Sequence, residues 1–187
     1  LSASQLPNEL ITAAEQALNV FDFEPVAKTK MVPAHYGYTV SGTDSDETLL
    51  ANREGFKQFQ IRARRLIDVR NTDTSTNIFG VPWKTPIGLS PIGGQRKFDP
   101  DGELAVARAA RSGEHTQILS TQTNNSVEDV TAARGAPIWY QLYPSNYWHV
   151  TESLVKRAEQ AGCPVVAVTV DRQAGRNAET FERYARA

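Results

Sequence analysis

Polar side chains that both donate and accept hydrogen bonds stand at the ends of four short apolar segments of this chain. Hydroxyl and amide groups of this kind can face a ligand from several strands at once. A Ser-Pro-Ile-Gly-Gly loop follows the first segment and offers bare backbone, because glycine has no Cβ to hold a flat ligand away. The polar residues are, in chain order, Ser90, Ser120, Gln141 with Tyr143, and Thr169.

Strands and helices are predicted to alternate through this part of the chain. Apolar runs predict strands at 117–121, 138–143 and 165–171, with helix-patterned segments at 127–134 and 150–161 between them. This order predicts a parallel sheet built from βα units. In such sheets ligands bind at the C-terminal ends of the strands. We therefore expect the five polar side chains to converge on one mouth, although each alone could merely satisfy loop backbone.

The residues before the sheet are predicted to be mainly helical. Helical patterns cover 8–18, 22–31 and 43–56, an element at 33–41 carries Tyr36 and Tyr38, and 78–83 reads as a hairpin. The predicted domains are an N-terminal helical extension with its lead-in hairpin over 1–80 and the first four βα units over 81–187.

Composition agrees with a folded globular domain and argues against some partners. The chain has 187 residues, 40% hydrophobic and 22% charged, with a net charge of −1, so we expect no nucleic-acid partner. The single cysteine, Cys163, leaves no disulfide framework within the chain. Asp99, Asp101 and Glu103 are expected to favour a helix start rather than bind a metal. A cytoplasmic location is expected, with an exported form left open.

Several segments taken together carry a resemblance to a known family. They are 36–42, 48–53, 66–69 with 73–76, 91–95, 101–103, 141–143 and 169–171. From about residue 21 onward the chain resembles the FMN-dependent α-hydroxy acid oxidases and dehydrogenases, the group of glycolate oxidase, lactate oxidase, L-lactate dehydrogenase and mandelate dehydrogenase. The resemblance implies an α/β fold, the first half of a (β/α)8 TIM barrel. It also implies that FMN lies across the mouth and that an L-2-hydroxy acid is oxidised to the 2-keto acid.

The same resemblance implies roles for individual residues toward the cofactor. The backbone of Pro91, Ile92 and Gly93 would approach the flavin ring. The side chains of Ser120, Gln141 and Thr169 would then hydrogen-bond the polar edge of that ring, whose electronic properties such donors tune.

Substrate contacts are implied at three further positions. Tyr38 would hold the substrate carboxylate through a neutral donor, and Tyr143 would face the substrate oxygen. Arg176 takes the place of the substrate-binding arginine of the family, in a segment that is one residue shorter here.

Two positions depart from the family in ways that bear on the substrate cavity. Gln122 stands where most relatives have tryptophan, within a polar run at 121–126. Gly93 stands where many have alanine, which would open space beside the flavin and alter access of dioxygen.

Four βα units make only half of a barrel. The catalytic histidine of the family, the lysine beside the flavin and the phosphate loop belong to the other half, and none of His35, His115 and His149 matches that histidine. A half-barrel would leave two unpaired edges and an apolar inner face. We therefore expect a C-terminal half, as a second chain or segment, to complete the barrel and supply the general base. We also expect the completed protein to form a homo-oligomer.

Two other interpretations remain open at this point. One is a different FMN- or phosphate-binding barrel enzyme, of the isopentenyl diphosphate isomerase or inosine monophosphate dehydrogenase type, which lacks the Tyr38 segment. The other is a non-catalytic half-barrel that serves as an assembly module.

Overall fold

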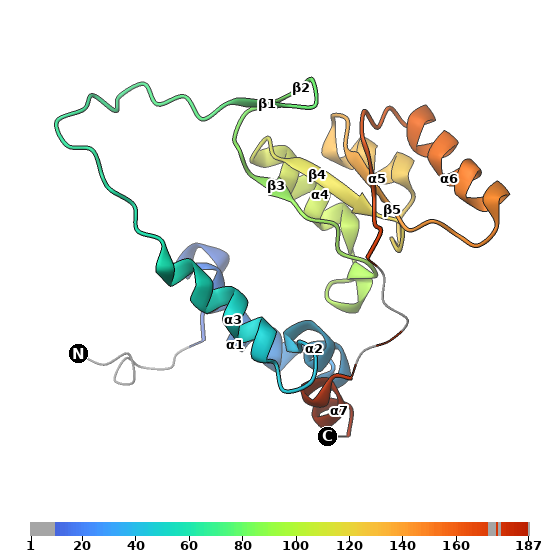
Figure 1. The fold of residues 1–187 in the computed structure, drawn as a ribbon, viewed down its shortest axis with the longest axis horizontal. Coiled ribbons are helices and arrows are strands. Elements are labelled where there is room, and N and C mark those ends of the chain that lie inside the picture. Colours follow the sequence, from blue (N-terminus) through green and yellow to red (C-terminus); the bar gives the residue numbers. More distant parts are fainter. Residues whose placement is uncertain (1–9, 172–174, 176, 187) are drawn as a thin grey trace. The chain divides into compact units, whose positions relative to one another are not determined.

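The computed structural model describes residues 10–171, 175 and 177–186, which form two compact units (Figure 1). The sheet unit comprises residues 62–174, and the helical unit comprises residues 1–61 together with 175–187.

The sheet unit is built on a parallel four-stranded sheet. Its strands β3 (Gly88–Leu89), β4 (Thr116–Ser120), β5 (Trp139–Leu142) and β6 (Val166–Val168) pair in sequence order. The helices α4 (Glu103–Ser112), α5 (Val127–Arg134) and α6 (Trp148–Gln160) connect them in turn. The predicted βα units are confirmed, because parallel neighbours require a crossover and each crossover here is a helix.

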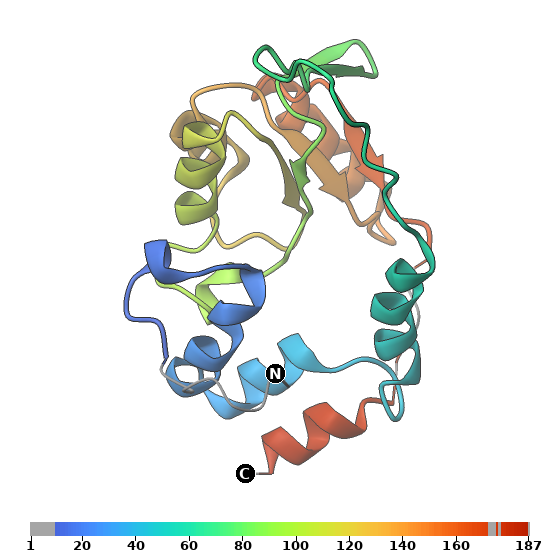
Figure 2. The same cartoon turned by 90° about the vertical axis from the view of Figure 1, so that its left-hand side faces the viewer.

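The three helices cover one face of the sheet, where the main core lies (Figure 2). Every second residue of β5 and its lead-in points to this side, since side chains alternate along a strand. Ile138, Tyr140 and Leu142 are buried there against Ala107 of α4 and Ala158 of α6. The residues between them, Trp139 and Gln141, therefore face the opposite side.

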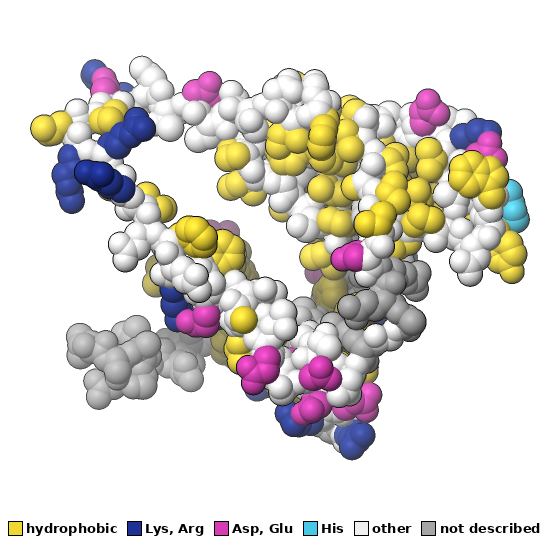
Figure 3. Space-filling model, viewed as in Figure 1, with side chains coloured by type: hydrophobic (Ala, Val, Ile, Leu, Met, Phe, Trp, Pro, Cys, Tyr) yellow, Lys and Arg dark blue, Asp and Glu magenta, His cyan; other side chains and the backbone are white. Residues whose placement is uncertain are grey.

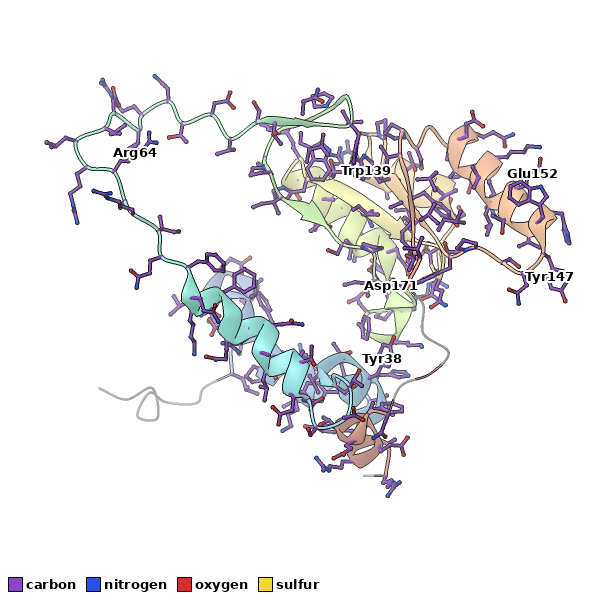
Figure 4. The ribbon with its side chains drawn as sticks, viewed as in Figure 1. Tyr38, Arg64, Trp139, Tyr147, Glu152 and Asp171 are labelled. Carbon is purple, nitrogen blue, oxygen red and sulfur yellow. The ribbon has the colours of Figure 1, made fainter. Side chains whose placement is uncertain are left out.

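A short hairpin packs on the first residue of β5. Strands β1 (Thr76–Ile78) and β2 (Val81–Trp83) are antiparallel, and both turn residues, Phe79 and Gly80, have positive φ angles of 52° and 77°. Two such residues are typical of the tight hairpin turns that match strand twist. The rings of Phe79 and Trp83 lie 5.8 and 5.2 Å from that of Trp139. Figure 4 shows Trp139 beside the hairpin.

The helical unit contains α1 (Phe23–Lys30), α2 (Pro33–Val40), α3 (Glu47–Glu54) and α7 (Glu179–Ala185). α2 and α7 pack closely: the rings of Tyr36 and Tyr184 meet edge to face at 5.2 Å. A Cβ on Gly37 would lie only 2.4 Å from the Cβ of Tyr184, so the approach of these helices depends on glycine. Asp44 N also donates to Asn177 O at 2.9 Å, which ties the C-terminal segment to this unit.

Some predicted elements are shorter in the structure. Within the expected helix at 8–18, the described residues form only a 3₁₀ turn at Ala14–Gln16. Leu18 is almost fully exposed, and a short helix without an apolar face to bury is marginal in water. Among the described residues, no helix combines the length and apolar character needed to cross a membrane.

Candidate functional site

Three polar side chains lie in a row at the C-terminal ends of β4, β5 and β6. Ser120 pairs in register with Gln141, and Thr169 follows β6 directly. Gln141 Nε2 donates to Thr169 Oγ1 at 2.8 Å. Ser120 and Gln141 are only 3% and 5% exposed. The alternation of side chains places all three on the face of the sheet away from the helices.

Backbone hydrogen bonds hold these strand ends together beyond the regular ladder. Thr121 N donates to Gln141 O at 2.9 Å, and Thr169 N donates to Leu142 O at 3.0 Å. The Thr121 hydroxyl also donates to Gln141 O and accepts from Tyr143 N at 2.9 Å. The row is therefore fixed by donors from both neighbouring strands.

Thr121 links two of the strand ends, a role that the sequence analysis did not predict. Its hydroxyl joins the end of β4 to the residue that follows β5. The only signal in the sequence is its place, directly after Ser120, at the start of a polar run.

The glycine loop after β3 lies against the loop after β4. Gly94 N donates to Gln122 O at 2.8 Å. A Cβ on Gly93 would lie 3.0 Å from the Cβ of Gln122, so the absence of a side chain allows this approach. Within the loop, Gln95 Nε2 donates to Ile92 O at 3.1 Å and fixes its curvature. Gly94 itself has a φ of 62°, which favours glycine.

Ser90 and Ile92 line a separate cavity of about 500 Å³ between β3, the 3₁₀ turn at Gln95–Lys97 and α4. Phe98, Ala105 and Val106 form much of its apolar wall. The structure thus brings Ser120, Gln141 and Thr169 together, whereas Ser90 faces this cavity with Ile92.

The row contains no charged side chain. Figure 3 shows hydrophobic side chains gathered over the strands of the sheet unit. On the helix side of β5, burial raises the pKa of Tyr140, so its hydroxyl stays neutral. The arrangement can offer neutral donors and acceptors to one edge of a flat ligand and glycine backbone to the ligand's face.

The expected substrate residues are distributed over both units. Tyr143 is half-buried and stands two residues after Gln141, on the same side of the chain. Tyr38 belongs to the helical unit, on α2, where its exposed ring meets Phe181 edge to face at 6.4 Å. Arg176 lies outside the described residues. Figure 4 labels Tyr38 on α2. It also labels Asp171, which follows β6 and lies at the end of the sheet opposite to Trp139.

Comparison with known proteins finds glycolate oxidases among the relatives of this chain. Glycolate oxidase 1 of Zea mays is 38% identical over 168 residues, which are 89% of this chain and 46% of that protein. Glycolate oxidase of Spinacia oleracea is also 38% identical over 168 residues, with the same coverage of both chains. The chain thus spans about half the length of the relatives it matches.

Solved structures agree with this result. A crystal structure of mandelate oxidase superposes with a TM-score of 0.84 at 31% identity and covers 91% of this chain and 50% of its own. The four parallel strands and the three helices that connect them therefore correspond to part of a TIM barrel. Residues 27–185 match the sequence model of the family described as FMN-dependent dehydrogenase. Because that match spans most of the sequence, the chain belongs to the FMN-dependent dehydrogenase family.

Proposed function

We propose that this chain supplies the flavin-ring site and part of the substrate site of an enzyme that oxidises L-2-hydroxy acids to 2-keto acids with FMN. The observation that carries the proposal is the row of Ser120, Gln141 and Thr169, aligned across three parallel strands and linked by the Gln141–Thr169 hydrogen bond. Membership of an FMN-dependent family and the names of the relatives, glycolate and mandelate oxidases, support the cofactor and the substrate class.

The residues present fit a flavin in two respects. The row offers neutral hydroxyl and amide groups, which suit the polar edge of the ring, where the electronic properties of the flavin are tuned. The loop carrying Pro91, Ile92 and Gly93 would present its backbone to the face of the ring, and the missing Cβ of Gly93 allows this loop to lie against Gln122. When bound, FMN would supply the acceptor for the two electrons that leave the substrate.

In this proposal the substrate is held by three side chains of the chain. The Tyr38 hydroxyl donates to the substrate carboxylate, and Arg176 pairs with that carboxylate. Tyr143 donates to the oxygen at the reacting carbon. Since none of the chain's histidines matches the base of the family, the proton of the substrate hydroxyl goes to a base in the other half of the barrel.

A second half of the barrel is the partner that we propose for this chain. The relatives are about twice its length, and β3 and β6 end the sheet within the described residues. Val168 and Val170 at the β6 edge are exposed. Because unpaired apolar edges favour association, this edge suits pairing with a further strand. The mass of the denatured, purified protein should reveal a companion polypeptide or a longer chain; a single 20.6 kDa species would refute this part. We also propose that the completed protein forms a homo-oligomer.

The function is tested by the colour of the purified protein. We expect flavin absorbance that bleaches when glycolate, lactate or mandelate is added without dioxygen and that returns with dioxygen or an artificial dye. Bound flavin that none of the acids bleaches would favour a different barrel enzyme. A colourless protein that does not take up added FMN would contradict the proposal and favour a non-catalytic assembly module.

A further inference from the structure

Glu103, the first residue of α4, carries a carboxylate that is closed off from solvent. Its exposed fraction is 0%. The ion pairs among the residues that the structure describes do not include it. Burying a carboxylate is costly unless hydrogen-bond donors replace the lost water. The donors that surround Glu103 therefore indicate what this carboxylate does.

Those donors come from two different loops. Glu103 Oε1 accepts from Gln95 N, on the glycine loop after β3, and from Asn124 N, on the loop after β4, both at 3.2 Å. The Asn125 amide, oriented with its nitrogen toward Glu103, donates to Oε2 at 2.9 Å and accepts from Arg96 Nη2 at 3.1 Å.

The same two loops carry the proposed flavin-facing backbone and Gln122. Gln95 follows Gly94, whose N–H donates to Gln122 O. Arg96 N donates to Asn124 Oδ1 at 3.1 Å, which adds a further link. One buried carboxylate thus accepts from a backbone amide in each loop. Each of these amides lies two residues after one of the contacting residues, Gly93 or Gln122.

We propose that Glu103 is a positioning residue, which sets the spacing of the two loops and so the positions of Gly93 and Gln122 relative to flavin and substrate. It acts through backbone amides and does not touch either ligand. This inference rests on the proposed function for its effect on catalysis, whereas the link between the loops is a property of the chain itself.

The test compares Glu103→Leu with the conservative variant Glu103→Gln. Leucine removes both acceptors, whereas glutamine keeps one oxygen for the two amide donors. In Glu103→Leu without ligand, we expect hydrogen exchange at the Gln95 and Asn124 amides to be at least about fivefold faster, the effect of losing one net hydrogen bond. With flavin bound, kcat/KM should fall by about 10- to 100-fold, as for a small misplacement of reacting groups. The flavin absorbance band of Glu103→Leu should also shift. In Glu103→Gln, kcat/KM and the absorbance band should return largely to the values of the unaltered protein.

Asp101→Asn is the matched control. Asp101 lies two residues earlier at the same helix start but is exposed and pairs with Arg108, away from both loops. It should leave exchange, absorbance and kcat/KM unchanged. If Glu103→Leu does not fold, Asn125→Ala decides, because it removes the donor to Oε2 and the acceptor for Arg96 but leaves both backbone donors to Oε1 in place. A smaller change in the same direction supports the proposal, and no change overturns it.

Unchanged kcat/KM and flavin absorbance in folded, flavin-loaded Glu103→Leu would overturn the positioning role. A second outcome separates the two proposals. If hydrogen exchange is faster in Glu103→Leu but the unaltered protein binds no flavin, the proposed function is overturned and the link between the loops is supported.

Discussion

The Gln122 side chain lies against Gly93, so that a Cβ added at Gly93 would stand 3.0 Å from Gln122 Cβ and 3.3 Å from Gln122 O. Two positions at which the resemblance implies a departure from the family are therefore in contact.

Gly93→Ala should destabilise the protein because the new methyl group must displace Gln122. We expect the free energy of unfolding to fall by about 1 kcal/mol, at the low end of the cost of overpacking. Urea denaturation measures this. The double variant Gly93→Ala/Gln122→Gly should recover most of the loss, since it removes the opposing Cβ; equal losses in the single and double variants would show that the contact is unimportant.

Tyr38→Phe should weaken substrate binding and leave the flavin bound. Losing a hydrogen bond to a carboxylate costs about 1.5–3 kcal/mol, so we expect KM to rise by roughly 10- to 100-fold. Steady-state kinetics together with flavin content per protein provide the measurement. Tyr147→Phe, on an exposed ring of the sheet unit, is the control; loss of flavin from Tyr38→Phe would contradict the assignment.

Gly37→Ala should disrupt the packing of α2 on α7. The added Cβ would lie 2.4 Å from that of Tyr184, so we expect a loss of about 2 kcal/mol or more in unfolding free energy. Gly55→Ala is the control in the same unit, because a Cβ there meets nothing within 4 Å. Chemical denaturation followed by circular dichroism would reveal the difference. Equal stability of the two variants would argue against close α2–α7 packing.

The pair of Glu128 on α5 and Arg157 on α6 should stabilise the protein only above acidic pH. Arg157 Nε and Nη2 donate to the two carboxylate oxygens at 2.7 and 2.9 Å, and these bonds lower the pKa of Glu128. A lowered pKa means that the contribution is complete above the unfolded value, about 4.3, and disappears as pH falls through the folded value.

A double-mutant cycle with Glu128→Gln and Arg157→Gln measures this coupling. It should be small, because both side chains are about half exposed. It should be present at neutral pH and absent near pH 2. A coupling that persists when the carboxylate is protonated would contradict the ionic origin.

The Cys163 thiol should react slowly in the folded protein. Burial raises its pKa to about 11, so little thiolate exists at pH 8. We expect disulfide reagents to modify it about 100-fold more slowly than in the denatured chain, where the pKa is about 8.5. Comparable rates in the two states would mean that the thiol is accessible.

Much of the sheet unit was predictable from the sequence because its elements are locally consistent. The helix at 127–134 has the predicted bounds, since Ser126 caps its start by accepting from Asp129 N at 3.0 Å and Gly135 ends it at a φ of 72°. The polar residues at the C-terminal ends of the apolar runs also included Ser120, Gln141 and Thr169, which the structure brings together.

Other features depend on contacts that no local pattern records. Glu103 reads as an ordinary acidic residue at a helix start, yet its carboxylate is buried between two loops distant in sequence. α7 was not predicted, because its packing depends on the fit of Tyr184 over Gly37, across about 150 residues of chain. The roles of all the proposed site residues toward cofactor and substrate, including those of Tyr38 and Arg176, stay predictions.

The two tryptophan rings that meet edge to face at the start of β5 give the protein an optical signature of its own. Trp83 and Trp139 have centroids 5.2 Å apart and planes inclined by 63°, so their electronic transitions couple. The coupled pair would produce a circular dichroism couplet that vanishes when the hairpin detaches. Unfolding at the base of the sheet can thus be followed without any label, separately from events at the strand ends.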